Sequence, residues 1–185
     1  ELDVCDGETT QYNGNTLQAG DQMDFFFTNE AGCDSVVSVS VNAMPLIEYD
    51  FTTLESCPNT ASGNISIQTL STDYTYSIDG VNFQNEPNFE NLQAGTYTLQ
   101  VQDANGCMVE ESIDVFSLPN LQYVVEDVII TCEDLEAELE VQVFAGDMNT
   151  LSVLWDDGST DLNRTISQAG AYSVIVSDGC QSIET

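Results

Sequence analysis

Six cysteines are the residues of this chain best suited to chemistry of their own. They fall into three pairs, each an isolated cysteine followed later by a Gly-Cys dipeptide, namely Cys5 with Cys33, Cys57 with Cys107 and Cys132 with Cys180. An even number of cysteines, without C-x-x-C spacing and in a chain without histidine, is typical of disulfides rather than of a zinc site. Because disulfides persist in oxidising compartments, we expect a protein outside the cytosol. The regular placement predicts one bridge within each pair.

Carboxylates are the second group that could do chemistry. The chain has 32 acidic residues against a single basic one, Arg164, and its formal net charge is −31. Clustered carboxylates could hold a hard cation such as Ca²⁺. The clusters that could supply ligands are Glu126, Asp127, Glu133, Asp134, Asp156, Asp157 and Asp161. The series from Asp157 to Asp161 lacks the glycine and the final glutamate of an EF-hand loop. We therefore expect no cofactor, with a calcium site in one of these clusters as the alternative to a solvated acidic face.

The same composition excludes several functions. A nucleophilic triad needs a base such as histidine or lysine, and the chain has neither. Paired carboxylates could act as acid and base, but among so many acids a chance pair carries no information. Binding to nucleic acid or to an acidic membrane surface needs lysine and arginine against phosphates. We expect neither an enzyme nor a nucleic-acid-binding protein.

The elements that must position these residues are predicted to be strands. Tyr97, Leu99 and Val101 alternate with polar residues, which is the period of a half-buried strand. Residues 37–41, 135–143 and 172–176 show the same alternation. Asp-Gly and Asn-Gly pairs between such segments suit tight turns. The pattern predicts an all-β chain of small, immunoglobulin-like β-sandwich modules, each with its own disulfide.

Internal repetition sets the expected boundaries. Gln-Ala-Gly occurs three times, at residues 18–20, 93–95 and 168–170, and each copy lies between the two cysteines of one pair. We therefore divide the chain into a first repeat (1–45), a short or partial β module; a second repeat (46–118), a β-sandwich; and a third repeat (119–185), an immunoglobulin-like sandwich. Little sequence follows Cys180. We expect the last strand of the third repeat to be completed by another segment or subunit.

Two groups of aromatic residues have predicted roles. Trp155 lies between the two cysteines of the third repeat, which resembles the core tryptophan packed near a cystine in immunoglobulin domains. Tyr97 and Tyr172 follow Ala-Gly at the start of a strand, which resembles a tyrosine corner. The alternative is that all three are ordinary core aromatics. Phe25, Phe26 and Phe27 are consecutive, so on a strand they cannot all face one core. At least one should point outward, as a contact surface for a neighbouring module, a subunit or a ligand.

The second repeat resembles a known kind of module. Tyr-Ser-Ile-Asp-Gly at 76–80, Ala-Gly-Thr-Tyr-Thr at 94–98 and Asp-Ala-Asn-Gly-Cys at 103–107 are similar to the SprB-type repeat of Bacteroidota gliding-motility adhesins. Segments of the other two repeats resemble further repeats of the same secreted proteins, including their immunoglobulin-like repeat. These segments are Cys-Asp-Gly-Glu at 5–8, residues 31–36, Leu-Trp-Asp-Asp-Gly-Ser-Thr at 154–160 and residues 169–174.

The resemblance implies an extracellular, cell-surface protein exported by the type 9 secretion system, with a structural or adhesive role. Its partners would be neighbouring modules of the same giant chain, or other copies in a homo-oligomeric fibre. The family repeats carry no catalytic residues. A carbohydrate- or protein-binding module and a calcium-stiffened linker are the alternatives. We expect no membrane insertion, since no stretch of 18 apolar residues occurs; without a visible signal peptide, we expect a mature or excised fragment.

Overall fold

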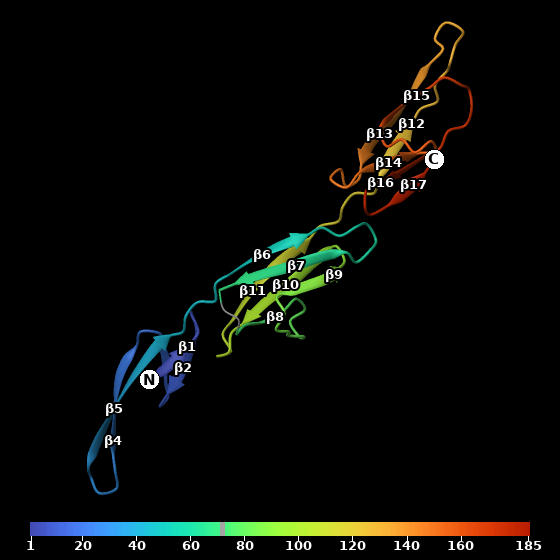
Figure 1. Cartoon of the computed structure of the whole chain (residues 1–185). Coiled ribbons are helices and arrows are strands. Elements are labelled where there is room, and N and C mark those ends of the chain that lie inside the picture. The colour runs from blue at the N-terminus through green and yellow to red at the C-terminus, as the bar shows by residue number, and fades with distance from the viewer. Residues whose placement is uncertain (71–72) are drawn as a thin grey trace. The chain divides into compact units, whose positions relative to one another are not determined.

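The protein is built from strands (Figure 1). The computed structural model describes residues 1–70 and 73–185, and within them it contains seventeen strands, β1 to β17, and no helix. The prediction of an all-β chain is therefore confirmed. The chain divides into two compact units. Unit 1 comprises Glu1–Asp50, Gln68–Pro87 and Thr98–Glu111, and unit 2 comprises Phe51–Ile67, Asn88–Tyr97 and Ser112–Thr185.

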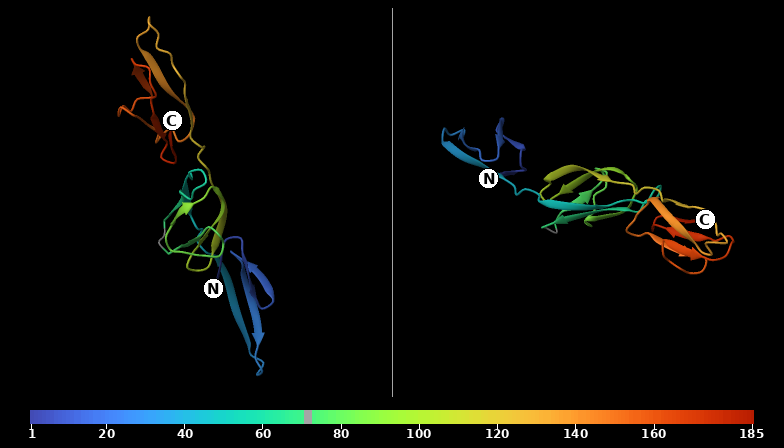
Figure 2. Two further views of the ribbon diagram at one scale, coloured as in Figure 1. Left: turned by 90° about the vertical axis from the view of Figure 1, so that its right-hand side faces the viewer. Right: turned by 90° about the horizontal axis from the view of Figure 1, so that it is seen from above.

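In unit 1, the first repeat forms a three-stranded sheet and a hairpin. The sheet has the order β1 (Leu2–Val4), β5 (Asp34–Ala43), β4 (Gln22–Thr28), and the hairpin joins β2 (Thr9–Tyr12) to β3 (Asn15–Gln18). The long antiparallel pair β4–β5 is drawn in blue (Figure 1, Figure 2). Strand β1 runs parallel to the end of β5, with Val4 opposite Ala43. The small core consists of Val4, Leu17, Phe25, Val39 and Val41.

The second repeat supplies two further sheets. One has the order β6 (Tyr49–Leu54), β7 (Gly63–Thr69), β9 (Asn88–Leu92), and the other has the order β11 (Met108–Val115), β10 (Gly95–Gln102), β8 (Thr75–Ser77). The predicted alternation is present in β10, where Leu99 and Val101 are completely buried while Thr98 is exposed. Leu99 and Val101, which the alternating pattern predicts to face the core, are therefore buried.

In unit 2, the third repeat forms a sandwich of two three-stranded sheets. One has the order β12 (Gln122–Val125), β13 (Ala137–Ala145), β15 (Asn163–Ile166), and the other has the order β14 (Ser152–Trp155), β16 (Val174–Ser177), β17 (Ser182–Glu184). Both sheets contribute to one core of Leu121, Leu139, Val141, Val153, Trp155, Ile166, Val174 and Val176. The chain itself supplies a short last strand, since β17 pairs with β16 from Ser182 to Glu184. The expectation that another segment or subunit completes this strand stays a prediction.

Both predicted tyrosine corners are present. The hydroxyl of Tyr97 donates a hydrogen bond to the backbone carbonyl of Gln93 at 2.8 Å, and that of Tyr172 donates to Gln168 at 2.6 Å. A bond from a tyrosine to the backbone four residues upstream ties the start of a strand to the loop before it. Trp155 is a core residue of β14, but the cystine of the third repeat that was expected beside it does not form. Its indole Nε1 donates to the carbonyl of Asp161 at 2.9 Å. The buried indole nitrogen is thus satisfied.

Every sheet takes its strands from a single one of the three predicted repeats. The two compact units do not follow the same boundaries, since the second repeat contributes segments to both. The division into three modules at residues 45 and 118 stays a prediction.

Candidate functional site: the disulfide bridges

The disulfides join different repeats, so the predicted pairing is wrong. Cys5 is bonded to Cys107, 102 residues away and within unit 1, and Cys57 is bonded to Cys180, 123 residues away and within unit 2. Cys33 and Cys132 are free and exposed. The bridges Cys5–Cys33, Cys57–Cys107 and Cys132–Cys180 therefore do not form, and no repeat has a disulfide of its own.

Strand length explains the missing bridge in the first repeat. Cys5 follows Val4, which lies opposite Ala43 at the end of β5, whereas Cys33 precedes the start of β5. A strand of 10 residues spans about 33 Å at about 3.3 Å per residue. The Cα atoms of a disulfide lie less than about 7 Å apart. The two cysteines are therefore at opposite ends of the long strand.

The same relation holds along β11. Cys107 immediately precedes this strand, whereas Ser56, next to Cys57, pairs with Ser117 just beyond its end. The amide of Ser56 donates to the carbonyl of Phe116 at 2.8 Å. The 8 residues of β11 span about 26 Å, which is too far for a bond between Cys57 and Cys107.

In the third repeat the long strand is β13. Cys132 lies in the segment before it, whereas Asp178, two residues before Cys180, lies beside Gly146 at its other end. The amide of Asp147 donates to a carboxylate oxygen of Asp178 at 3.2 Å. The 9 residues of β13 span about 30 Å, so these two cysteines also belong to opposite ends of their repeat.

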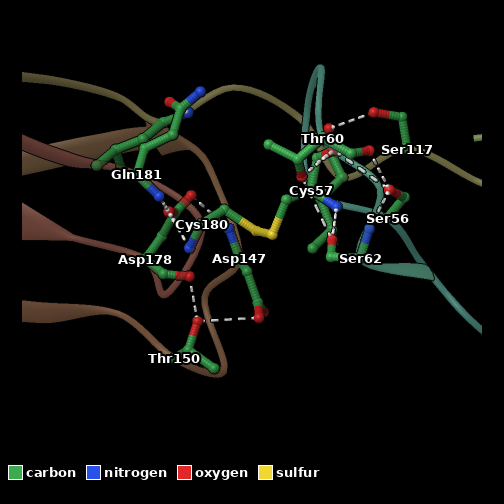
Figure 3. The surroundings of a disulfide bond; sticks show 12 residues. Ser56, Cys57, Thr60, Ser62, Ser117, Asp147, Thr150, Asp178, Cys180 and Gln181 are labelled. Atoms are coloured by element: carbon green, nitrogen blue, oxygen red, sulfur yellow. Dashed lines mark hydrogen bonds between the residues drawn. A yellow bond between two sulfur atoms is a disulfide. The ribbon is translucent and has the colours of Figure 1, made fainter. Parts of the chain in front are cut away.

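Hydroxyl groups position Cys57 for its bond (Figure 3). The carbonyl of Cys57 accepts from the amide of Thr60 at 3.2 Å, and its amide donates to the hydroxyl of Ser62 at 2.7 Å. Ser56 is fully buried, and its hydroxyl donates to the carbonyl of Thr60 at 2.8 Å. Asn59 sits in the turn with a φ of 57°, a conformation that asparagine tolerates well. The Cys-Pro-Asn-Thr turn is therefore held from both sides.

A buried carboxylate positions Cys180 on the other side of the bridge (Figure 3). Asp178 is 1% exposed, and its two oxygens accept hydrogen bonds from the amides of Cys180 at 3.1 Å, Gln181 at 2.7 Å and Asp147 at 3.2 Å. Three amide donors satisfy a buried carboxylate without a basic residue. The hydroxyl of Thr150 contacts the backbone carbonyl of Asp178.

The Cys5–Cys107 bridge also connects two turns. The carbonyl of Cys5 accepts from the amide of Glu8 at 3.0 Å, and the amide of Cys107 donates to a carboxylate oxygen of Asp103 at 2.8 Å. Cys107 is buried, and its sulfur lies 3.3 Å from that of Met44. The two bridges are therefore alike. In each, a cysteine that begins a turn is bonded to the cysteine of a Gly-Cys turn, and an aspartate accepts hydrogen bonds from the backbone of that second turn.

The single base of the chain occupies one of the predicted metal clusters. Arg164 forms ion pairs with Asp156 and Asp157, and its guanidinium lies 4.8 Å from the ring centre of Tyr172 and 5.7 Å from that of Trp155. Bonds from the hydroxyl and amide of Ser159, and the charge of Arg164, lower the pKa of Asp157. The guanidinium of Arg164 therefore already supplies a positive charge beside Asp156 and Asp157.

The structure does not bring the other predicted ligands together. Glu126 and Asp127 are exposed at the end of β12, and Glu133 and Asp134 lie in a turn in which their amides donate to the hydroxyl of Thr131. Asp161 contributes its backbone carbonyl, which accepts the hydrogen bond from the indole nitrogen of Trp155. Among residues 1–70 and 73–185, no group of three or more side chains is arranged to hold a metal ion. Calcium binding stays a prediction.

The three phenylalanines divide as a strand requires. Phe25 is buried, with its ring centre 4.8 Å from that of Tyr12, whereas Phe26 is 74% exposed and Phe27 39% exposed. The prediction that at least one of them faces outward is confirmed. Phe26 lies opposite Val36, which is itself 54% exposed, so an apolar pair stands on the outer face of β4 and β5.

Sequence reasoning missed Asp178 and Ser56. Asp178 precedes a Gly-Cys pair, as an aspartate also precedes the turn at Cys107, and this recurrence was the available signal. Ser56 carries no comparable signal, since its hydroxyl matters only because the fold buries it. Within the described ranges, no helix is long and apolar enough to cross a bilayer.

Two disulfides point to an oxidising compartment outside the cytosol. Neither the models of known protein families nor the sequences of curated proteins give a match to this chain.

Proposed function

We propose that this chain is a non-catalytic, structural or adhesive segment of a large secreted cell-surface adhesin or filament, in which disulfides couple successive repeats. The observation that carries the proposal is the pairing itself. Each bridge joins the first cysteine of one repeat to the Gly-Cys cysteine of the next, across 102 and 123 residues. Such bonds add nothing to a catalytic centre, but they prevent neighbouring repeats from separating when the chain is stretched.

Composition supports the same role. The chain has no histidine and no lysine, so two of the side chains that commonly transfer protons at neutral pH are absent. A formal net charge of −31 keeps it from binding other acidic surfaces. The tandem repeats resemble SprB-type and immunoglobulin-like modules of gliding-motility adhesins exported by the type 9 system, which favours the extracellular surface over the periplasm.

Localisation tests this proposal directly. Antibodies raised against the chain, with gold-labelled secondary antibodies, should decorate filaments or the outer surface of intact source cells in electron micrographs. Treatment of the cells with protease before labelling should remove the signal. Labelling that requires permeabilised cells would place the protein inside and exclude a role at the surface.

A binding module is the second candidate, and it is favoured by one observation. Phe26 and Val36 form an exposed apolar pair on adjacent strands, the kind of side chains that stack on sugar rings or pack on a protein. The variant Phe26→Ser should abolish binding to a glycan array or to host extracellular matrix if this candidate holds, and the variant Thr16→Ser on the neighbouring hairpin is the control. Absence of binding by the unaltered chain would remove it.

A further inference from the structure

The two bridges follow one rule. Cys5 and Cys57 are the first cysteines of the first and second repeats, and they are bonded to Cys107 and Cys180, the Gly-Cys cysteines of the second and third repeats. Two independent bonds thus have the same register, from the first cysteine of one repeat to the second cysteine of the next. Under this rule, one first cysteine and one Gly-Cys cysteine of the chain have no partner within it.

The two free cysteines are the ones that the rule leaves over. Cys33 is the Gly-Cys cysteine of the first repeat, so its partner by the rule is the first cysteine of a preceding repeat. Cys132 is the first cysteine of the third repeat, so its partner is the Gly-Cys cysteine of a following repeat. Both are exposed. We infer that Cys132 and Cys33 are complementary ends of the same disulfide series, and that Cys132 bonds to the Gly-Cys turn of another repeat of this kind, such as Cys33 of a second copy.

Their positions within the repeats agree with this inference. In the first repeat, Cys33 precedes β5 while the bridged Cys5 lies beside the end of that strand. In the third repeat, Cys132 precedes β13 while the bridged Cys180 belongs to the turn beside its end. Each free cysteine is therefore at the end of its repeat opposite to the existing bridge, where a further repeat can reach it.

The turn around Cys33 already has the form of a bridged turn. The amide of Asn29 donates to the carbonyl of Cys33 at 3.0 Å, and the amide of Cys33 donates to the side-chain oxygen of Asn29 at 3.0 Å. The corresponding bonds between Asp103 and the bridged Cys107 are 3.0 Å and 2.8 Å. Gly32 and Gly106 precede the two cysteines with φ values of 76° and 91°. The turn at Cys33 therefore has the same backbone form and hydrogen bonds as the turn that holds Cys107 in its bond to Cys5.

The bond requires an external oxidant. In a glutathione redox buffer, the Cys132 thiolate attacks oxidised glutathione, forms a mixed disulfide and releases one glutathione thiolate. The Cys33 thiolate of a second copy then attacks the Cys132 sulfur and displaces the second glutathione. Two protein thiols lose two electrons and two protons in total, and glutathione disulfide is reduced to two thiols.

The experiment uses the purified chain and the variants Cys33→Ser and Cys132→Ser, one of them carrying a size tag. In the redox buffer at about pH 8.5, the unaltered chain should form a ladder of covalent oligomers on a non-reducing gel. The mixed variants should form the Cys132–Cys33 heterodimer in about tenfold excess over either homodimer, a preference of modest free energy. The double variant should stay monomeric.

Other outcomes overturn the inference. These are a statistical mixture of homodimers and heterodimers, no covalent dimer at all, or a Cys33–Cys132 bond within one copy by peptide mapping. Loss of the Cys5–Cys107 or Cys57–Cys180 peptides from the map would remove the rule itself. A polypeptide with two copies in tandem distinguishes the source of the partner: a bond between Cys132 of the first copy and Cys33 of the second, in dilute monomer, shows that a repeat of the same chain can supply it. None of these results depends on an adhesive role.

Discussion

Cys57 is bonded to Cys180, 123 residues further along the chain. Because the other bridge runs from Cys5 to Cys107, the two covalent loops overlap from residue 57 to residue 107. A force applied to the two ends is therefore carried through both bridges. While the disulfides remain intact, the segment from Cys57 to Cys107 and the short ends set the largest distance to which the two ends of the chain can be pulled apart.

This overlap predicts a short extension under force. With both bridges intact, the shortest covalent path between the ends includes about 60 residues, which span about 210 Å at about 3.5 Å per residue. The fully reduced chain of 185 residues spans about 650 Å at the same rise. Single-molecule force spectroscopy in a tandem array with known marker domains should show the extension increase about threefold when a reductant is added. Equal extension with and without reductant would mean that the bridges do not carry the load.

Removing a bridge should lower stability. The chain-entropy estimate for a loop of 123 residues is about 5 kcal/mol. The variant Cys57→Ser/Cys180→Ser should therefore lower the free energy of unfolding, measured by urea denaturation, by up to about 5 kcal/mol. The matched control is Cys33→Ser/Cys132→Ser, which removes two exposed thiols and should change stability by less than about 0.5 kcal/mol. Equal losses in both variants would contradict the assignment of the bridges.

The sequence predicts the strands but not the disulfides, and the reason is physical. Alternation identifies buried positions such as Leu99 and Val101 because a strand buries every second side chain. The partner of Cys57, by contrast, depends on which end of β11 lies beside Ser56. Repetition along the sequence does not show which cysteines lie at the same end of the folded strands. The cystines therefore no longer support three independent modules, and that interpretation now rests on the pairing of the strands alone.

The environment of Arg164 should control cleavage by trypsin. Its side chain is 12% exposed and is held by Asp156, Asp157 and the ring of Tyr172, and it is the chain's single Lys or Arg residue. We expect slow cleavage of the folded chain. The variant Arg164→Lys keeps the charge but loses the planar fork and the stacking, so it should destabilise the third repeat by about 1 kcal/mol and be cut faster.

The bridge gives this test a second readout. Because Cys180 lies after the cleavage point and is bonded to Cys57 before it, the two fragments should stay together on a non-reducing gel and separate only after reduction. Fragments that separate without a reductant would show that the bond is absent.

The turn carboxylate Asp79 predicts a dependence on pH. The amide and side chain of Asn82 and the amide of Val81 donate to it, and these bonds lower its pKa. A carboxyl with a depressed pKa in the folded state stabilises the fold above its ordinary pKa of 3.8 and loses that contribution as the pH falls further. The variant Asp79→Ala should therefore lower the melting temperature at pH 7, and the difference should shrink toward about pH 2. The control is Glu30→Ala, which removes an exposed carboxyl in the turn after β4 and is measured at the same pH values. A constant difference at all pH values would contradict the prediction.

The acids of β13 predict a dependence on salt. Glu138 and Glu140 lie two residues apart on the exposed face of this strand, opposite Thr165 and Asn163. Side chains two residues apart on a strand are about 7 Å from one another, which is within the Debye length of about 8 Å at physiological ionic strength. They therefore repel one another, and we expect the melting temperature to rise with sodium chloride.

The variant Glu138→Gln/Glu140→Gln tests this repulsion. It should be more stable than the unaltered chain at low salt and should respond less to added salt. The control Glu30→Gln/Glu55→Gln makes the same change in net charge at two exposed sites outside the strands, so it isolates the local effect from the general field of the polyanion. Equal stabilisation by the two double variants would mean that the repulsion is spread over the whole surface.

A melting temperature that does not change with sodium chloride in any of the three proteins would show that the acids of β13 do not destabilise the fold. A larger rise with calcium chloride than with sodium chloride at equal ionic strength would indicate that divalent cations bind this face.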